Sequence, residues 1–115
     1  MLLGRYGEAL AAEYLRKKGC RILAMNYRTR LGELDVIAAD RRYVIFAEVK
    51  LRKNAAFAEA REFVTFAKRQ KLAAAAEEWL QKNPQKLQPR FDVIEIYAPD
   101  GMQTKRPQIR QIEDA

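Results

Sequence analysis

The stretch 42–50 restricts the fold of this chain more than any other, because it predicts a strand in the middle of a sheet. Its residues 43–47 are β-branched, aromatic or small, without alternation between apolar and charged positions. Glu48 and Lys50 follow directly and, being two residues apart on a strand, share one face. Charged side chains rarely enter a sheet interior unless they are paired or bind a metal. The stretch therefore predicts a central strand that ends in a charged site.

A second apolar stretch, 33–39, repeats this pattern with acidic residues at its start. Glu33 and Asp35 are also two residues apart and share one face of their strand. The dipeptide at 40–41 can form a tight reversal between the two stretches. If the strands pair around it, the carboxylates of Asp35 and Glu48 converge at one end of the sheet.

The remaining elements are predicted from periodicity and from terminal signals. Ala11 and Leu15 fall on one face of an N-terminal helix that Gly19 ends, and Pro84 follows the end of a second helix. The predicted elements are a helix at 4–18, strands at 20–27, 33–39 and 42–50, a loop at 51–60, a helix at 61–82, a polar loop at 83–90, a strand at 91–97 and a tail at 105–115 whose Ile109 and Ile112 dock as a short edge strand. This αβββαβ order predicts an α/β fold with a small mixed sheet flanked by helices.

The composition fits a single domain, 1–115, and excludes several kinds of site. The absence of histidine excludes histidine general bases, Ser-His-Asp and Cys-His triads and histidine-ligated zinc. The single cysteine, Cys20, cannot form an internal disulfide, which fits a cytoplasmic protein. The first residues are charged too soon for a signal peptide, and no run of about 18 apolar residues exists, so we expect no membrane span.

The charge balance favours a polyanionic partner. The 22 Lys and Arg residues exceed the 15 Asp and Glu residues, which gives a net charge of +7. On a small domain such an excess favours nucleic acid, and we expect DNA. The candidate phosphate contacts are Arg28, Arg30, Arg52, Lys68 and Lys71. The alternative is a generally basic protein whose lysines lie on solvated helix faces.

Asp35 and Glu48 form the centre of a predicted metal site. Two carboxylates held together raise one pKa unless a cation lies between them. Without histidine the ligands would be oxygen atoms, which favours Mg²⁺ or Mn²⁺. Lys50 would orient the attacking water or neutralise the transition state of phosphodiester hydrolysis. The alternative is an exposed strand end, with Lys50 in solvent.

Glu8 is a third candidate ligand, contributed by the N-terminal helix. It shares the helical face of Ala11 and Leu15, which should meet the core. From there it would bind the metal directly or through a metal-bound water. The alternative is a first-turn glutamate that is favoured by the helix dipole.

Several motifs of the chain together resemble the YraN family of small bacterial proteins. The match extends over nearly the whole chain. Its motifs are Gly-x-x-Gly-Glu-x-x-Ala from Gly4, then Tyr14-Leu15, Gly19, Asn26-Tyr27-Arg28, Gly32-Glu33-Leu34-Asp35, Phe46-Ala47-Glu48-Val49-Lys50-x-Arg52, Lys68 and Arg90-Phe91-Asp92-Val93. The Glu-x-Lys motif alone would be weak, whereas the set is specific.

The YraN family in turn resembles the PD-(D/E)xK nuclease superfamily, which has the restriction-endonuclease-like fold, and is similar in its core to archaeal Holliday-junction resolvases. By this resemblance Asp35 takes the first acidic position, Glu48 and Lys50 take the (D/E)xK positions, and Glu8 takes that of the helix glutamate. Leu34 stands where the superfamily motif has proline. The resemblance implies Mg²⁺-dependent hydrolysis that leaves a 5′-phosphate, and a homodimer, because cutting a junction needs two sites.

We therefore expect a metal-dependent endonuclease that acts on DNA at branched structures. The alternative is a non-catalytic nucleic-acid-binding module, an accessory to a DNA-processing complex, whose salt-sensitive binding would survive loss of the acids. A third interpretation is a scaffold that binds a protein partner through the apolar side of the 61–82 helix. The acids favour the enzyme, because a pure binder needs no buried carboxylates facing a phosphate.

Overall fold

The computed structural model describes residues 2–53 and 66–115, and the described chain contains every predicted helix and strand. In chain order the elements are α1 (Leu2–Lys17), β1 (Arg21–Arg28), β2 (Glu33–Ala39), β3 (Tyr43–Arg52), α3 (Phe66–Lys82), β4 (Gln88–Tyr97), the short 3-10 helix η1 (Gly101–Gln103) and β5 (Gln108–Ile112). The predicted loop at 51–60 is wrong at residues 51–52, because β3 continues to Arg52 in its ladder with β4. The rest of that loop beyond residue 53, and residues 61–65 of the predicted second helix, lie outside the described residues. No helix in the described ranges is long and apolar enough to cross a membrane.

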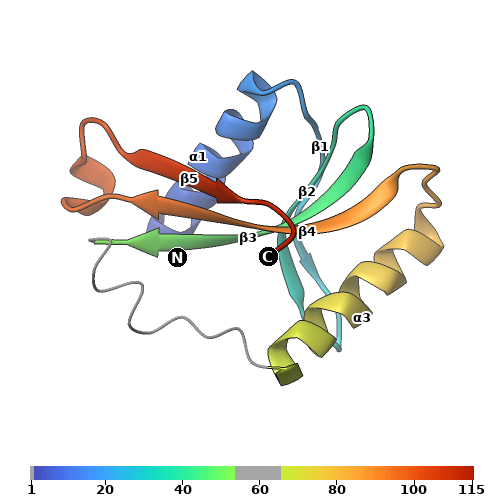
Figure 1. The fold of residues 1–115 in the computed structure, drawn as a ribbon. Helices are drawn as coiled ribbons and strands as arrows, with labels where there is room; N and C mark the ends of the chain where they lie inside the picture. The colour runs from blue at the N-terminus through green and yellow to red at the C-terminus, as the bar shows by residue number, and fades with distance from the viewer. Residues whose placement is uncertain (1, 54–65) are drawn as a thin grey trace.

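Five strands lie side by side in one mixed sheet in their chain order, β1-β2-β3-β4-β5. Neighbouring strands are antiparallel except β3 and β4, which run parallel from the pair Tyr43–Gln88 to the pair Arg52–Tyr97. A parallel pair needs a crossover connection, and α3 lies in it. α1 covers one face of the sheet and α3 the other (Figure 1). The predicted α/β class, a small mixed sheet flanked by helices as in a restriction-endonuclease-like core, is confirmed.

Each face of the sheet has its own hydrophobic core, because β2 and β3 are apolar on both sides. Under α1, the buried Leu15 packs in one cluster with Val36 and Ile45. Under α3, Trp79 packs edge-on against Phe46, with ring centroids 5.8 Å apart. Coverage from both sides explains why 43–47 shows no alternation between apolar and charged residues.

The predicted loop at 83–90 is wrong over its last three residues, because β4 begins at Gln88. Gln88 donates its N–H to the carbonyl oxygen of Arg42, 3.0 Å away, and opens the parallel ladder with β3. Pro89 has no N–H to donate, but the N–H at this position would point away from β3. Since β5 pairs with β4 only from Val93 onward, Pro89 lies on an open edge of the sheet and is tolerated.

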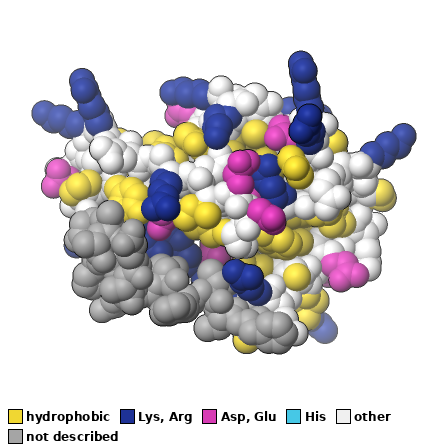
Figure 2. Space-filling model, viewed as in Figure 1, with side chains coloured by type: hydrophobic (Ala, Val, Ile, Leu, Met, Phe, Trp, Pro, Cys, Tyr) yellow, Lys and Arg dark blue, Asp and Glu magenta, His cyan; other side chains and the backbone are white. Residues whose placement is uncertain are grey.

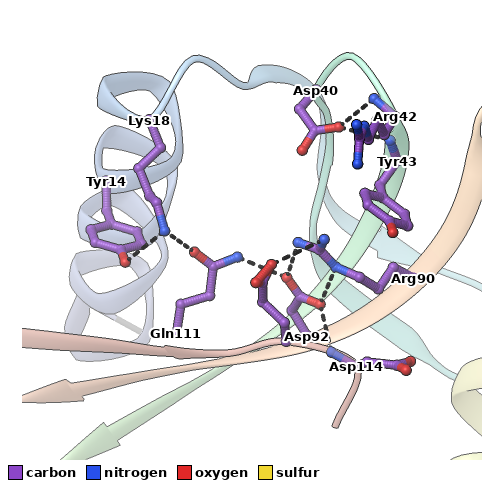
Figure 3. A network of polar contacts seen from close by, with 10 residues as sticks. Tyr14, Lys18, Asp40, Arg42, Tyr43, Arg90, Asp92, Gln111 and Asp114 are labelled. Carbon is purple, nitrogen blue, oxygen red and sulfur yellow. Dashed lines mark hydrogen bonds and ion pairs between the residues drawn. The ribbon is translucent and has the colours of Figure 1, made fainter.

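A buried ion pair at the start of β4 fastens the C-terminal strand to the rest of the fold (Figure 3). The Asp92 side chain is fully buried and accepts two hydrogen bonds from Arg90, at 2.9 and 2.8 Å. It also accepts the side-chain amide of Gln111 at 2.7 Å and the N–H of Asp114 at 3.1 Å. Gln111 in turn accepts a hydrogen bond from Lys18, next to the end of α1, at 2.9 Å. Asp92 thus links β4 to β5 and, through Gln111, to the region where α1 ends.

Replacing Asp92 with alanine is expected to lower the free energy of unfolding by about 3 kcal/mol, because Arg90 stays mostly buried after losing its partner. Urea unfolding followed by circular dichroism measures the loss. Glu113→Ala is the control, because Glu113 pairs with the same Arg90 at 3.1 Å but its side chain is 58% exposed. That variant should lose about 1 kcal/mol or less. Equal losses in the two variants would contradict the role given to Asp92.

Candidate functional site

The site begins where β2 and β3 separate. Their ladder ends at the pair Val36–Ala47, and beyond it β2 continues paired with β1 alone. The N–H of Val49, on β3, instead donates to the carboxylate Oδ2 of Asp35 at 2.8 Å. A side chain thus satisfies a backbone donor that the departing strand no longer meets. This hydrogen bond holds Asp35 between the two strands, in what we call the strand fork.

Glu48 lies on β3, one residue past the last ladder pair, and is held by two lysines. Its Oε1 is 2.9 Å from Nζ of Lys50, on the same strand, and 2.6 Å from Nζ of Lys68, which reaches in from α3. Burial acts to raise the pKa of Glu48, but the hydrogen bonds from Lys68 and Lys50 outweigh it and lower this pKa below its ordinary value. Glu48 is therefore charged at neutral pH and fixes the position of Lys50.

Asp35 is in the opposite electrostatic situation. Burial raises its pKa, the hydrogen bond from the Val49 N–H acts against that rise, and the negative charges of Glu8, Glu48 and Glu33 add to it, giving a pKa of about 6. Asp35 and Glu48, on neighbouring strands, thus have pKa values that are shifted in opposite directions. Glu48 has two ammonium partners, whereas other carboxylates dominate the charge that acts on Asp35.

Two cavities meet at these acids. The charged cavity has a volume of about 290 Å³ and is lined by Gly32, Glu33, Asp35, Glu48, Lys68, Lys71 and Leu72. The apolar cavity has a volume of about 220 Å³, and its apolar walls are Leu34, Phe46, Ala47, Leu72, Ala73, Phe91 and Val93. Asp35 and Glu48 border both cavities. In the space-filling view, hydrophobic surface lies next to acidic and basic side chains between the sheet and α3 (Figure 2).

The donor atoms at the fork are those that a hard divalent cation prefers. Asp35 and Glu48 offer carboxylate oxygens, and Glu8, on α1, is near enough for its charge to raise the pKa of Asp35. Within residues 2–53 and 66–115, however, no three acidic or thiol side chains already lie together as a metal-binding group. Metal binding, and the part of Glu8 in it, therefore stay predictions.

The structure brings some of the predicted phosphate contacts to the acids and leaves others outside. Lys68 and Lys71 line the charged cavity, side by side on α3. Arg28 is exposed at the end of β1, where its Nε is 3.6 Å from the carboxylate of Glu33. Arg30 is exposed in the turn between β1 and β2. The two lysines thus line the charged cavity, whereas neither arginine does, although Arg28 pairs with Glu33, which is part of the lining.

Glu95 belongs to this face of the sheet and was missed by the sequence analysis. It is 8% exposed, lies opposite Lys50 in the β3–β4 ladder, and approaches Arg52 at 3.9 Å and Arg110 at 3.8 Å. Arg52, predicted to contact phosphate, is thereby placed against a carboxylate, two residues beyond Lys50. Glu95 interrupts the apolar run 93–96 in the same way that Glu48 follows an apolar run, so the same sequence pattern could have identified it.

These features define a class: a small α/β domain with two acids and a lysine at a strand fork. The chain belongs to the UPF0102 family, since the model of "Uncharacterised protein family UPF0102" matches residues 7–96. This confirms the predicted membership of the YraN family, which is the same family. The matched range includes Glu8, Asp35, Glu48 and Lys50.

The sequences of curated UPF0102 proteins align with this chain over most of their lengths. A UPF0102 protein of Rhodococcus opacus is 40% identical over 116 residues, which cover 100% of this chain and 96% of the relative. A UPF0102 protein of Geotalea daltonii is 44% identical over 114 residues, covering 98% and 87%. A UPF0102 protein of Nocardia farcinica is 46% identical over 101 residues, covering 86% and 79%.

Neutralising Asp35 is expected to stabilise the fold at neutral pH. Its folded pKa of about 6 lies above the ordinary 3.8, so its ionisation destabilises the folded state as the pH rises through that window. Asp35→Asn should therefore gain about 1 kcal/mol at pH 7.5, after discounting for partial exposure, and nothing at a pH near 3.5. Urea unfolding at both pH values measures the difference.

Glu48→Gln is the matched variant and should behave in the opposite way. The lowered pKa of Glu48 means that its charge stabilises the fold above its unfolded pKa of 4.5, and that this contribution is lost as the pH falls through the folded value. The variant should lose stability at pH 7.5 and lose little at low pH. A loss of stability in Asp35→Asn at pH 7.5 would contradict the charge asymmetry between the two acids.

Gly32 sets how closely the β1–β2 turn can approach α3, beside the charged cavity. A Cβ at position 32 would lie 2.9 Å from the backbone carbonyl oxygen of Lys71. Gly32→Ala must therefore displace the turn or the helix, and we expect a loss of about 1–3 kcal/mol in thermal unfolding. Gly4→Ala, on α1 with nothing within 4 Å, should be neutral or stabilising. A neutral Gly32→Ala would show that the contact is not tight.

Proposed function

We propose that this protein is a Mg²⁺- or Mn²⁺-dependent endonuclease that hydrolyses phosphodiester bonds of DNA, at branched structures. The observation that supports this best is the strand fork, where Asp35, Glu48 and Lys50 come together beside two cavities. The net charge of +7 suits a polyanionic substrate. Cutting a junction on both sides needs two such sites, which a homodimer would supply.

Each charged residue of the fork would have a separate part in hydrolysis. Asp35 and Glu48, with Glu8, would hold the metal ion, and a bound divalent ion lowers the pKa of water and offsets charge on phosphate oxygens. Lys50, fixed 2.9 Å from Glu48, lies beside that position and can orient the attacking water. Lys68, on the wall of the charged cavity, adds positive charge for the phosphate.

The raised pKa of Asp35 supports a cation at the fork. A carboxylate surrounded by other carboxylates is costly to ionise, and a divalent ion between Asp35 and Glu48 would remove that cost. A site that is destabilising when empty and relieved by its ligand is common where function rather than stability has been selected.

A second candidate function, a non-catalytic nucleic-acid-binding module, is favoured by one observation. The charge of Glu48 is already balanced by Lys50 and Lys68 without a metal. In that case the acid would serve to position lysines for phosphate contact. DNA binding would then be salt-sensitive and would survive Asp35→Ala and Glu48→Ala.

Calorimetric titration with Mn²⁺ tests the metal site directly. The wild type should bind Mn²⁺, and Glu48→Gln should bind at least about tenfold more weakly, because one carboxylate ligand becomes a neutral amide. Glu13→Gln is the control, since Glu13 is an exposed acid on α1 that pairs with Lys17. Its affinity for Mn²⁺ should equal that of the wild type.

Cleavage assays then separate the two candidate functions. Single-stranded, duplex and four-way-junction DNA are incubated with Mg²⁺ or Mn²⁺ and with the wild type, Asp35→Asn or Lys50→Met. We expect junction cleavage by the wild type alone. If no DNA form is cut, and the protein binds no Mn²⁺ either with or without DNA, the proposal of an endonuclease is wrong. Salt-sensitive DNA binding that persists in Asp35→Ala would then favour the binding module.

A further inference from the structure

The charged cavity and the apolar cavity form one continuous amphipathic site. Asp35, Glu48 and Leu72 border both, so the two spaces share a wall. On one side of that wall α3 contributes the ammonium groups of Lys68 and Lys71. On the other side most of the surface is aromatic and aliphatic, with Arg69, Asp92 and Asp114 at its border. A ligand that fills both must have an anionic part and a flat apolar part joined by a short link.

The apolar cavity has the size and surface of a site for a single ring system. Its volume of about 220 Å³ exceeds the roughly 150 Å³ that suffices to bind benzene in an apolar protein cavity. Phe46 and Phe91 lie on its sheet side with ring centroids 5.5 Å apart, and Phe91 is only half-buried. Leu72 and Ala73 form its α3 side. An aromatic ring presented at such a wall can stack on it.

Two of the acidic side chains that line the apolar cavity already have partners of their own, whereas Arg69 is exposed at its border. Asp92 is saturated by Arg90, Gln111 and the N–H of Asp114, and Glu48 is held by lysines. The walls formed by Leu34, Phe46, Leu72, Ala73, Phe91 and Val93 offer nonpolar contact. Such a surface favours the face of a ring over a hydrogen-bonding edge, and so takes any base rather than one particular base.

We propose that the apolar cavity is a subsite for an unstacked nucleobase, one belonging to the nucleotide whose phosphate lies in the charged cavity. This rests on the proposed function, since it assigns the charged cavity to a phosphate of DNA. Within an intact duplex both faces of each base are covered by stacked neighbours, so the base must leave the stack to enter. The substrate class is therefore DNA with unpaired nucleotides, such as single strands and the unpaired bases at branch points.

A double-mutant cycle between protein and DNA isolates the contribution of the base. The probes are two fluorescent single strands of about twelve nucleotides, one of thymidines and one of abasic residues, which carry the same phosphate charge. Binding is measured by fluorescence anisotropy in EDTA, so that neither metal nor cleavage contributes. Ala73→Leu fills the cavity from an exposed position of α3, and Gln70→Leu adds the same side chain to an exposed position outside the lining.

The wild type and Gln70→Leu should bind the thymidine strand at least about fivefold more tightly than the abasic strand. Ala73→Leu should bind both strands with the affinity that the wild type has for the abasic strand. Phe91→Ala, which removes the stacking surface, should reduce the preference in the same way. Circular dichroism of each variant checks that the fold is intact.

Three results would overturn the inference in distinguishable ways. Equal affinity of the wild type for both strands would show that no base is bound, and would leave the endonuclease standing if junctions are cut. A preference for thymidine that persists in Ala73→Leu would place the base contact elsewhere. No binding of either strand, together with no cleavage of any DNA form, would overturn both the subsite and the nuclease.

Discussion

The separation of β2 from β3 after the pair Val36–Ala47 is the constraint on which the site depends. Two strands that stayed paired would satisfy each other's backbone and leave no room for a carboxylate. Because β2 departs with β1, a donor of β3 is left over and the Asp35 side chain takes it at 2.8 Å. That one hydrogen bond places an acid inside the sheet without an unsatisfied amide. The cavities, the lysines of α3 and the proposed chemistry all follow from this opening.

The two acids of the strand fork lie in opposite electrostatic surroundings. The lysines that surround Glu48 make it a stabilising part of the fold, whereas the carboxylates near Asp35 make that residue a destabilising one at neutral pH. The stability of the domain is supplied elsewhere, by the two cores and by the buried Asp92 pair with its second partner, Gln111. Asp92 thus stabilises the fold beside the apolar cavity that it lines together with Asp35 and Glu48, whereas Asp35 lowers the stability at neutral pH.

The sequence predicts the strands and the acids well because both depend on local rules. Unbroken apolar runs identify β2 and β3, and period-two spacing puts Glu48 beside Lys50. The start of β4 is not predicted, because Pro89 is a loop signal unless one knows which edge of the strand is open. The pairing of Lys68 with Glu48 is not predictable either, since it depends on how α3 is rotated and how closely it approaches Gly32. Both facts belong to tertiary packing, which a single strand or helix pattern does not contain.

The parallel pairing of β3 with β4 has a consequence for when the site comes into existence. Residues 33–50 pair as a hairpin of local contacts, whereas Lys68 and Leu72 belong to the crossover that leads to the parallel pairing of β3 with β4. Parallel pairing over such a sequence separation is slow compared with hairpin formation. During synthesis the strands that carry Asp35 and Glu48 are thus made before α3, which contributes the lysines of the charged cavity. A chain released before residue 97 would have both carboxylates but not the complete strand fork with its charged cavity, so the candidate site is completed only in the last steps of folding.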